Sequence, residues 1–202
     1  MKTGLIGLAA IVILVLLGLF LWGPSVYDKA VALQEESDAK WGDVQSSYQR
    51  RADLIGNLVE TVKGAANFEQ ETLTAVVEAR AKATSIQLDP NNMTPENLKQ
   101  FEEAQAGMNS ALSRLLVTVE KYPELKATEN FLQLQAQLEG TENRINTARD
   151  RYNESVKNYN THIRGFFRKT ILGILGDEEF PKREVFEAES GADKAPDVNF
   201  AE

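Results

Sequence analysis

The stretch that decides the fold is RRADLIGNLVETVKG, residues 50–64, in which apolar side chains return every three or four positions. Ile55 and Val62 belong to one heptad series, and Ala52 and Val59 belong to its companion. This spacing places the four side chains on one stripe of a helix, which predicts that the helix buries one face against other helices. Two arginines and an aspartate stand beside the stripe, so the segment is also a candidate polar site.

Helical periodicity of the same kind covers most of the chain. It predicts a first helix over about 26–86, a second from Pro95 to about Tyr122 and a third over about 125–167. Between the first two, LDPNNMTPENL forms a turn in which Thr94 is placed to cap a helix that begins at Pro95. Few segments alternate with the period of two that a strand requires, so the sequence predicts an all-α fold, an antiparallel bundle of long helices.

The N-terminal GLIGLAAIVILVLLGLFLW, residues 4–22, contains no charged side chain and ends in Trp22. As a helix, its roughly 19 residues would extend about 28 Å, close to the thickness of a membrane's hydrocarbon layer. We therefore predict an uncleaved transmembrane anchor over 1–25, with a break at Gly23 and Pro24, in preference to a cleaved signal peptide. Lysines flank the segment on both sides, so both membrane orientations of the soluble part stay open.

The soluble bundle is expected to occupy residues 26–176, and the composition of the chain changes after it. Residues 177–202 are rich in Gly, Pro, Asp and Glu, which predicts a polar, partly disordered C-terminal tail. Phe180, Phe186 and Phe200 interrupt this tail and could dock back onto the bundle.

The composition argues against several classes of function. The 202 residues carry a net charge of -8, which disfavours nucleic-acid binding, and no cysteine is present for a disulfide, a thiolate metal site or a nucleophile. His162 is the only histidine, so a catalytic triad, a zinc site and a di-iron bundle all lack ligands. We expect the neighbouring carboxylates to form a solvated face. The sequence therefore predicts no enzymatic activity, no cofactor and no metal.

Polar residues beside the seams of two predicted helices form the candidate site. On the first helix, Arg50, Asp53 and Asn57 share one face, and the third helix carries polar residues at similar spacing. Polar groups at core positions cost stability unless they are paired, and their best-attested use is to fix helix register. We expect pairing between the two helices, with a ligand- or partner-binding site as the alternative. The candidate residues are Arg50, Arg51, Asp53, Asn57, Glu142, Asn146 and Arg149.

The stretch HIRGFFRKTILGIL, residues 162–175, is both basic and apolar. Such a segment could lie on a membrane surface or against a partner helix. Packing at the end of the bundle explains its composition equally well, so both interpretations stay open.

Three blocks of sequence resemble the LemA family. They are VYDKAVALQEESDAKWGDVQSSYQRRADLIGNLVETVKGAANFEQETLTAVVEARAKA, LEGTENRINTARDRYNESVKNYNTHIRGFF and FPKREVFEAESGADKAPDVNF. The resemblance covers nearly the whole chain, although the family commonly has proline at the position of Gly56. It implies a bacterial single-pass membrane protein whose soluble part has three long helices and a shorter one. It also implies no established enzymatic activity. Relatives in magnetosome membranes suggest membrane organisation.

The function expected from these observations is that of a membrane-anchored, non-enzymatic helical bundle in the bacterial inner membrane. It would act as a scaffold or adaptor, either as a homo-oligomer or with a membrane-protein partner. The alternative is a ligand- or signal-sensing module that uses the polar cluster on the first soluble helix.

Overall fold

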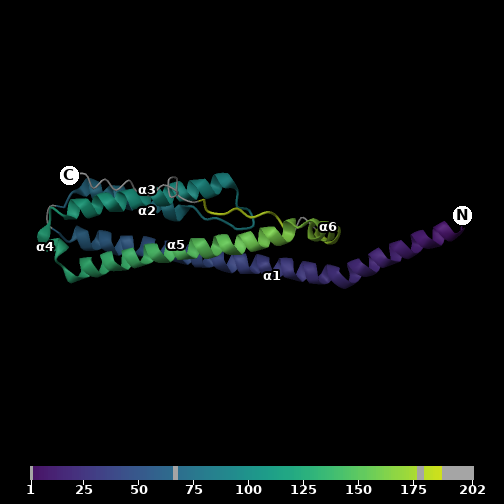
Figure 1. The fold of residues 1–202 in the computed structure, drawn as a ribbon. Helices are drawn as coiled ribbons and strands as arrows, with labels where there is room; N and C mark the ends of the chain where they lie inside the picture. The colour runs from purple at the N-terminus through teal and green to yellow at the C-terminus, as the bar shows by residue number, and fades with distance from the viewer. Residues whose placement is uncertain (1, 66–67, 177–179, 188–202) are drawn as a thin grey trace, which may run out of the picture.

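The fold is entirely helical in the part of the chain that the structure describes. This computed structural model describes residues 2–65, 68–176 and 180–187 (Figure 1). The helices are α1 (Lys2–Lys63), α2 (Gln70–Ser85), α3 (Pro95–Val119), α4 (Pro123–Lys126), α5 (Glu129–Arg164) and α6 (Phe166–Leu175). The predicted all-α class is confirmed, with α1, α3 and α5 as the long helices and α2 as a shorter one.

The bundle consists of two helix pairs that lie one above the other (Figure 1). α1 packs mainly against α5, and α2 packs mainly against α3. Toward α4, the core contains Leu58, Met108 and Leu115, and farther along the axis it contains Trp41 and Tyr152. The third cluster, where α6 closes the end, contains Val26, Ala30, Leu33, Tyr159, Ile163, Ile171, Leu172 and Phe180.

The first soluble helix ends earlier than the sequence periodicity predicted. α1 stops at Lys63 and α2 begins at Gln70, so the expectation of one helix over about 26–86 is wrong. The stripe continues across this reversal because both helices bury it in the same core. Gly64 follows the last residue of α1, and the ring of Phe68 lies 4.9 Å from that of Tyr122. This aromatic contact holds the segment before α2 against the segment between α3 and α4.

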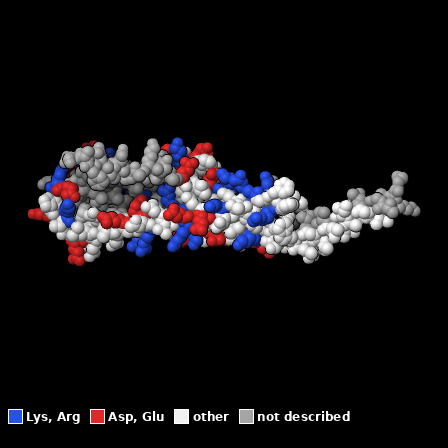
Figure 2. Space-filling model, in the orientation of Figure 1, with Lys and Arg blue, Asp and Glu red and all other residues white. Residues whose placement is uncertain are grey.

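α1 is nevertheless very long, because it extends in the other direction. It contains 62 residues, and a helix of this length extends about 93 Å. The expected break at Gly23 and Pro24 is absent, since the helix continues through Pro24. An internal proline removes one hydrogen bond and bends a helix without having to end it. The N-terminal part of α1 leaves the bundle at an angle, and its described atoms carry no charged group (Figures 1 and 2).

The predicted membrane anchor coincides with this protruding part of α1. The described apolar side chains between Ile6 and Trp22 are exposed, with Phe20 at 77%. Among the described residues, no helix is apolar over a sufficient length to span a membrane. The side chains at 2–5, 8, 9, 15, 16 and 19 lie outside the described part, so the anchor stays a prediction.

The turn between α2 and α3 has the predicted cap. The backbone N–H of Asn97 donates to Oγ1 of Thr94 at 3.2 Å, and the backbone N–H of Thr94 donates to Oδ1 of Asn97 at 2.8 Å. Pro95 is the first residue of α3, as expected. This reciprocal capping box satisfies N–H groups that would otherwise lack partners at the helix start.

Part of the predicted polar tail packs against the bundle. Residues 180–187 run in an extended conformation, with the side chains of Phe180 and Phe186 buried. The docking that the sequence left open for Phe180 and Phe186 is thus observed, and this segment is not loosely held. Residues 177–179 and 188–202, which include Phe200, lie outside the described part of the chain.

Candidate functional site

Arg51 lies inside the bundle, where its guanidinium contacts two other helices. The side chain is only 2% exposed. Its Nη1 donates to Oε2 of Glu142 at 3.0 Å and to Oδ1 of Asn109 at 2.9 Å. Its Nη2 donates to Oε1 of Gln105 at 2.6 Å. The planar fork of an arginine suits such divergent acceptors, so one residue joins α1 to both α3 and α5.

The environment of Arg51 is buried on one side and open to water on the other. The side chain of Glu142 is 44% exposed, so water screens this ion pair. On the inner side, the guanidinium lies 5.0 Å from the centre of the Tyr48 ring. Burial raises the pKa of Tyr48, although the nearby Arg149 and Arg51 lower it. The phenol is therefore uncharged near neutral pH and acts as a packing surface for the cation.

Arg149 forms a second polar contact along the same face of α5. Its Nη2 donates to Oε1 of Glu102 on α3 at 2.9 Å and to the carbonyl of Glu187 at 3.3 Å. Its guanidinium also lies 4.5 Å from the centre of the Phe186 ring. Arg149 therefore connects α5 to α3 and to the packed end of the tail.

Arg51 and Arg149 line one polar cleft of about 600 Å³. Glu142 and Asn146 contribute to its wall from α5, and Lys99 contributes from α3. Four of the predicted site residues thus come together here, with both arginines engaged by acceptors. In this cleft, Arg51 and Arg149 each form an ion pair with a carboxylate on another helix.

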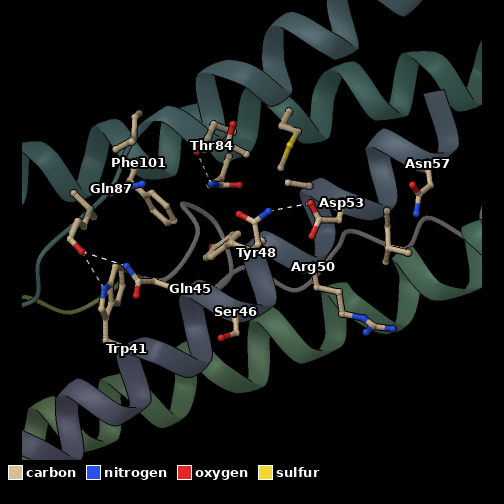
Figure 3. Close-up of a pocket in the computed structure, with 18 of the residues that line it drawn as sticks. Trp41, Gln45, Ser46, Tyr48, Arg50, Asp53, Asn57, Thr84, Gln87 and Phe101 are labelled. Carbon is tan, nitrogen blue, oxygen red and sulfur yellow. Dashed lines mark hydrogen bonds between the residues drawn. The ribbon is translucent and has the colours of Figure 1, made fainter. Parts of the chain in front are cut away.

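The other three predicted residues line a different cleft, shown in Figure 3. This cleft of about 810 Å³ lies between α1, α2 and α3 and includes Arg50, Asp53 and Asn57. Thr84 and Gln87 form the opposite wall, whereas Arg50 extends away from them (Figure 3). The predicted group is therefore divided, because successive residues of a helix point about 100° apart.

Asp53 pairs with α2 and not with α5. Its Oδ1 accepts a hydrogen bond from Gln49 at 2.9 Å and lies 3.7 Å from Nη2 of Arg80. Arg80 crosses α1 beside Gly56, where a Cβ would lie 3.4 Å from its Cζ, and donates through Nε to the carbonyl of Ala52 at 2.7 Å. Gly56 thus lies where the side chain of Arg80 on α2 closely approaches α1. The expected pairing of Asp53 with the third long helix is wrong.

Arg183 is the most enclosed cation described, and it was not among the predicted site residues. It is 1% exposed and comes from the tail segment 180–187. Its Nη1 lies 2.8 Å from Oδ1 of Asp38, and its Nη2 donates to Oδ1 of Asn91 at 2.7 Å. Its Cζ lies 5.2 Å from the centre of the Tyr159 ring. This side chain fastens the tail to α1, to the α2–α3 turn and to α5.

Two buried tyrosines of α5 hold the same segment through its backbone. The hydroxyl of Tyr152 donates to the carbonyl of Glu184 at 3.2 Å, and that of Tyr159 donates to the carbonyl of Pro181 at 3.0 Å. Burial raises the pKa of each phenol to about 12. Both groups are therefore protonated near neutral pH and act as donors, not as general bases.

Charged and hydrogen-bonding side chains line both clefts. The residues that line them include no nucleophile hydrogen-bonded to a histidine. Within residues 2–65, 68–176 and 180–187, no cluster of three or more His, Cys, Asp or Glu side chains could hold a metal ion.

Comparison with known proteins places the chain in a family. The model of the LemA family matches residues 40–200, which include both clefts and Arg183. The chain belongs to the LemA family. A Paramagnetospirillum magneticum protein named magnetosome protein MamQ 2 is 26% identical over 184 residues, which cover 83% of this chain and 66% of that protein. A Metamycoplasma hominis protein named protein LemA is 26% identical over 133 residues, which cover 65% and 57% respectively. The matched regions span two thirds or less of these relatives.

Proposed function

We propose that this LemA-family protein is a membrane-anchored, non-enzymatic scaffold or adaptor. The observation that carries the proposal is the continuity of α1. One helix, Lys2–Lys63, contains the apolar protruding part and also forms a wall of the bundle. A bundle joined to its anchor in this way is held rigidly at the membrane surface, which suits a protein that presents a surface to partners.

The apolar run at 4–22 supports anchoring as a single span in the bacterial inner membrane, with either orientation. The relatives named as magnetosome proteins support a role in membrane organisation by analogy. The contacts of Arg51 and Arg149 support a structural role, because both side chains already have hydrogen-bond acceptors within the protein. These acceptors lie on α5, on α3 and in the tail segment 180–187. The partner would be a second copy of the chain or another membrane protein.

In-cell photo-crosslinking of the full-length protein tests this proposal. A photoreactive amino acid is placed at Val117 on α3 and at Leu132 on α5, which are 69% and 51% exposed. Ser110 and Gln133, exposed polar positions on the same helices, serve as matched controls. Reproducible crosslinks to this chain or to one defined membrane protein would support the scaffold. Scattered crosslinks that do not differ from the controls would contradict it.

A second candidate function is sensing of a small ligand. The cleft of Figure 3 favours it, because Asp53, Asn57 and Thr84 present polar groups around a hollow of about 810 Å³. A screen for ligands that raise the melting temperature tests this function. A true ligand should lose its effect in Asp53→Ala and keep it in Glu60→Ala, an exposed acidic position of α1 outside the cleft. A ligand whose effect persists in Asp53→Ala would argue against this cleft.

A further inference from the structure

α6 has two apolar faces, and only one of them is covered by the bundle. Ile171 and Leu172 are 6% and 0% exposed and pack in the core. Phe166, Phe167 and Ile174 are 80%, 70% and 64% exposed. At about 100° per residue, these three side chains fall on one arc that faces away from Leu172. Two adjacent exposed phenylalanines are unusual for a side of a soluble bundle and indicate a contact surface.

The exposed face of α6 lies beside the end of the apolar run of α1. Trp22, Phe166 and Phe167 line one hollow of about 510 Å³. If residues 4–22 span the bilayer, Trp22 lies near the headgroup layer, where indole rings are favoured. The two phenylalanines must then lie at a similar depth, because they share the hollow with Trp22.

His162, near the end of α5, links α6 to α1 through two hydrogen bonds. Nε2 of His162 lies 3.0 Å from the carbonyl of Val26, and Nδ1 lies 3.0 Å from Nη1 of Arg168. Because an arginine can only donate, Nδ1 accepts and Nε2–H donates to Val26. Arg168 reaches His162 beside Gly165, where a Cβ would lie 3.2 Å from Nε of Arg168. The outward face of α6 is thus held at a set angle to the anchor.

The charges near α6 suit the surface of a membrane. Arg164 and Lys169 are exposed on this end, Lys29 is exposed on α1, and basic groups gather here in Figure 2. Three acidic residues follow at 177–179 in the sequence, outside the described part. Charge alone therefore does not select an anionic lipid, and the apolar area of the face must supply most of the binding.

We propose that the outward face of α6, formed by Phe166, Phe167 and Ile174, inserts into the headgroup region of the bilayer that anchors α1. The inference rests on the proposed anchoring and goes beyond it. The continuous α1 holds the bundle rigidly to its span, but the span itself can still tilt and rotate in the bilayer. A second contact beside the span fixes the face that the bundle presents. α6 thereby sets the orientation of the scaffold.

Labelling with a lipid-depth probe tests this contact. The chain has no cysteine, so Phe167→Cys gives one site for an environment-sensitive fluorophore in the full-length protein. Leu14→Cys on the apolar run and Val117→Cys on α3, 67% and 69% exposed, are the matched controls. The proteins are placed in vesicles of phosphatidylcholine, with and without phosphatidylglycerol, that carry quenchers at two depths. Helical circular dichroism checks that each variant is folded.

We expect shallow quenchers to reduce the signal at Phe167 about two-fold or more in both lipid mixtures, deep quenchers to act at Leu14, and neither to act at Val117. Quenching at Leu14 without quenching at Phe167 would overturn the role of α6 and leave the anchor intact. Quenching at neither site would overturn the anchoring itself. Energy transfer between labelled copies at Phe167, without quenching by lipid, would show that a second chain covers this face and would also overturn the inference.

The double variant Phe166→Ser, Phe167→Ser provides an independent check. Both side chains are exposed, so their loss should leave the helical signal and the quenching at Leu14 unchanged. A label at Ile174→Cys should lose its lipid quenching in this background. Unchanged quenching at that position would contradict the proposed contact.

Discussion

Replacing Arg51 by methionine keeps much of the side chain's apolar volume and removes its hydrogen bonds to α3 and α5. Gln105, which is 6% exposed, then lacks a donor for its Oε1, and an unsatisfied buried acceptor costs about 1–3 kcal/mol. Glu142 is 44% exposed and its carboxylate can bind water instead, so loss of this ion pair costs only about 0.2–1 kcal/mol of stability. The hydrogen bond to Asn109 is lost as well. We therefore expect Arg51→Met to lower the free energy of unfolding by about 2–4 kcal/mol.

Thermal unfolding of the full-length protein in detergent micelles, followed by helical circular dichroism, measures this loss. For a chain of this size it corresponds to a fall in Tm of roughly 4–16 °C. Arg50→Met is the matched control, because the neighbouring Arg50 is exposed and its loss should change stability by less than about 0.5 kcal/mol.

A double-mutant cycle with Glu142→Gln isolates the ion pair from the other contacts of Arg51. We expect a coupling free energy of about 0.5–1 kcal/mol, since one partner is buried and the other is half-solvated. The reasoning is refuted if Arg51→Met costs no more than Arg50→Met. If the losses of unfolding free energy are strictly additive, Glu142 does not contribute to the contact through which Arg51 sets the helix register.

Three further results are expected. Arg183→Met should release residues 180–187, seen as faster amide exchange there, whereas exposed Lys182→Met should leave exchange unchanged. Gly140→Ala should stabilise the protein by about 0.5–1 kcal/mol, because a Cβ there meets no atom within 4 Å and helical alanine is favoured; a lower Tm would contradict this. The pKa values of Tyr152 and Tyr159 are raised from 10.0 to about 12, so their contribution to stability is complete below pH 10 and falls as the pH rises to 12. Alkaline titration followed by tyrosinate absorbance and circular dichroism should show unfolding in that window, and ionisation near pH 10 without unfolding would oppose it.

Features governed by neighbouring residues were predictable from the sequence. The cap at Thr94 followed from its position before Pro95, and the structure has both hydrogen bonds of the capping box. The helix class and the seam through Ile55 also followed from local spacing. The end of α1 at Lys63 could not be predicted, because the spacing of apolar residues continues unchanged into α2 and a single glycine at position 64 is weak evidence for a helix end.

The candidate site was only partly predictable, because its pairing depends on residues far apart in the chain. The structure brings Arg51 to Glu142, 91 positions away, yet it pairs Asp53 with Arg80 of the adjacent helix. Arg183 resembled an ordinary tail charge, since its partner Asp38 lies 145 positions earlier. The buried Phe180 and Phe186 on either side were the only local signal that this tail segment could dock.

The distance between two spin labels tests whether α1 joins the apolar run to the bundle as one helix. The labels are attached at Leu14→Cys and Val31→Cys, both exposed and on opposite sides of Pro24, in the full-length protein in lipid nanodiscs. A continuous, slightly bent helix predicts one narrow distance distribution for a backbone separation of roughly 25 Å. A broad distribution, or a clearly shorter distance, would show that the anchor and the bundle move independently and would contradict a scaffold held rigidly at the membrane.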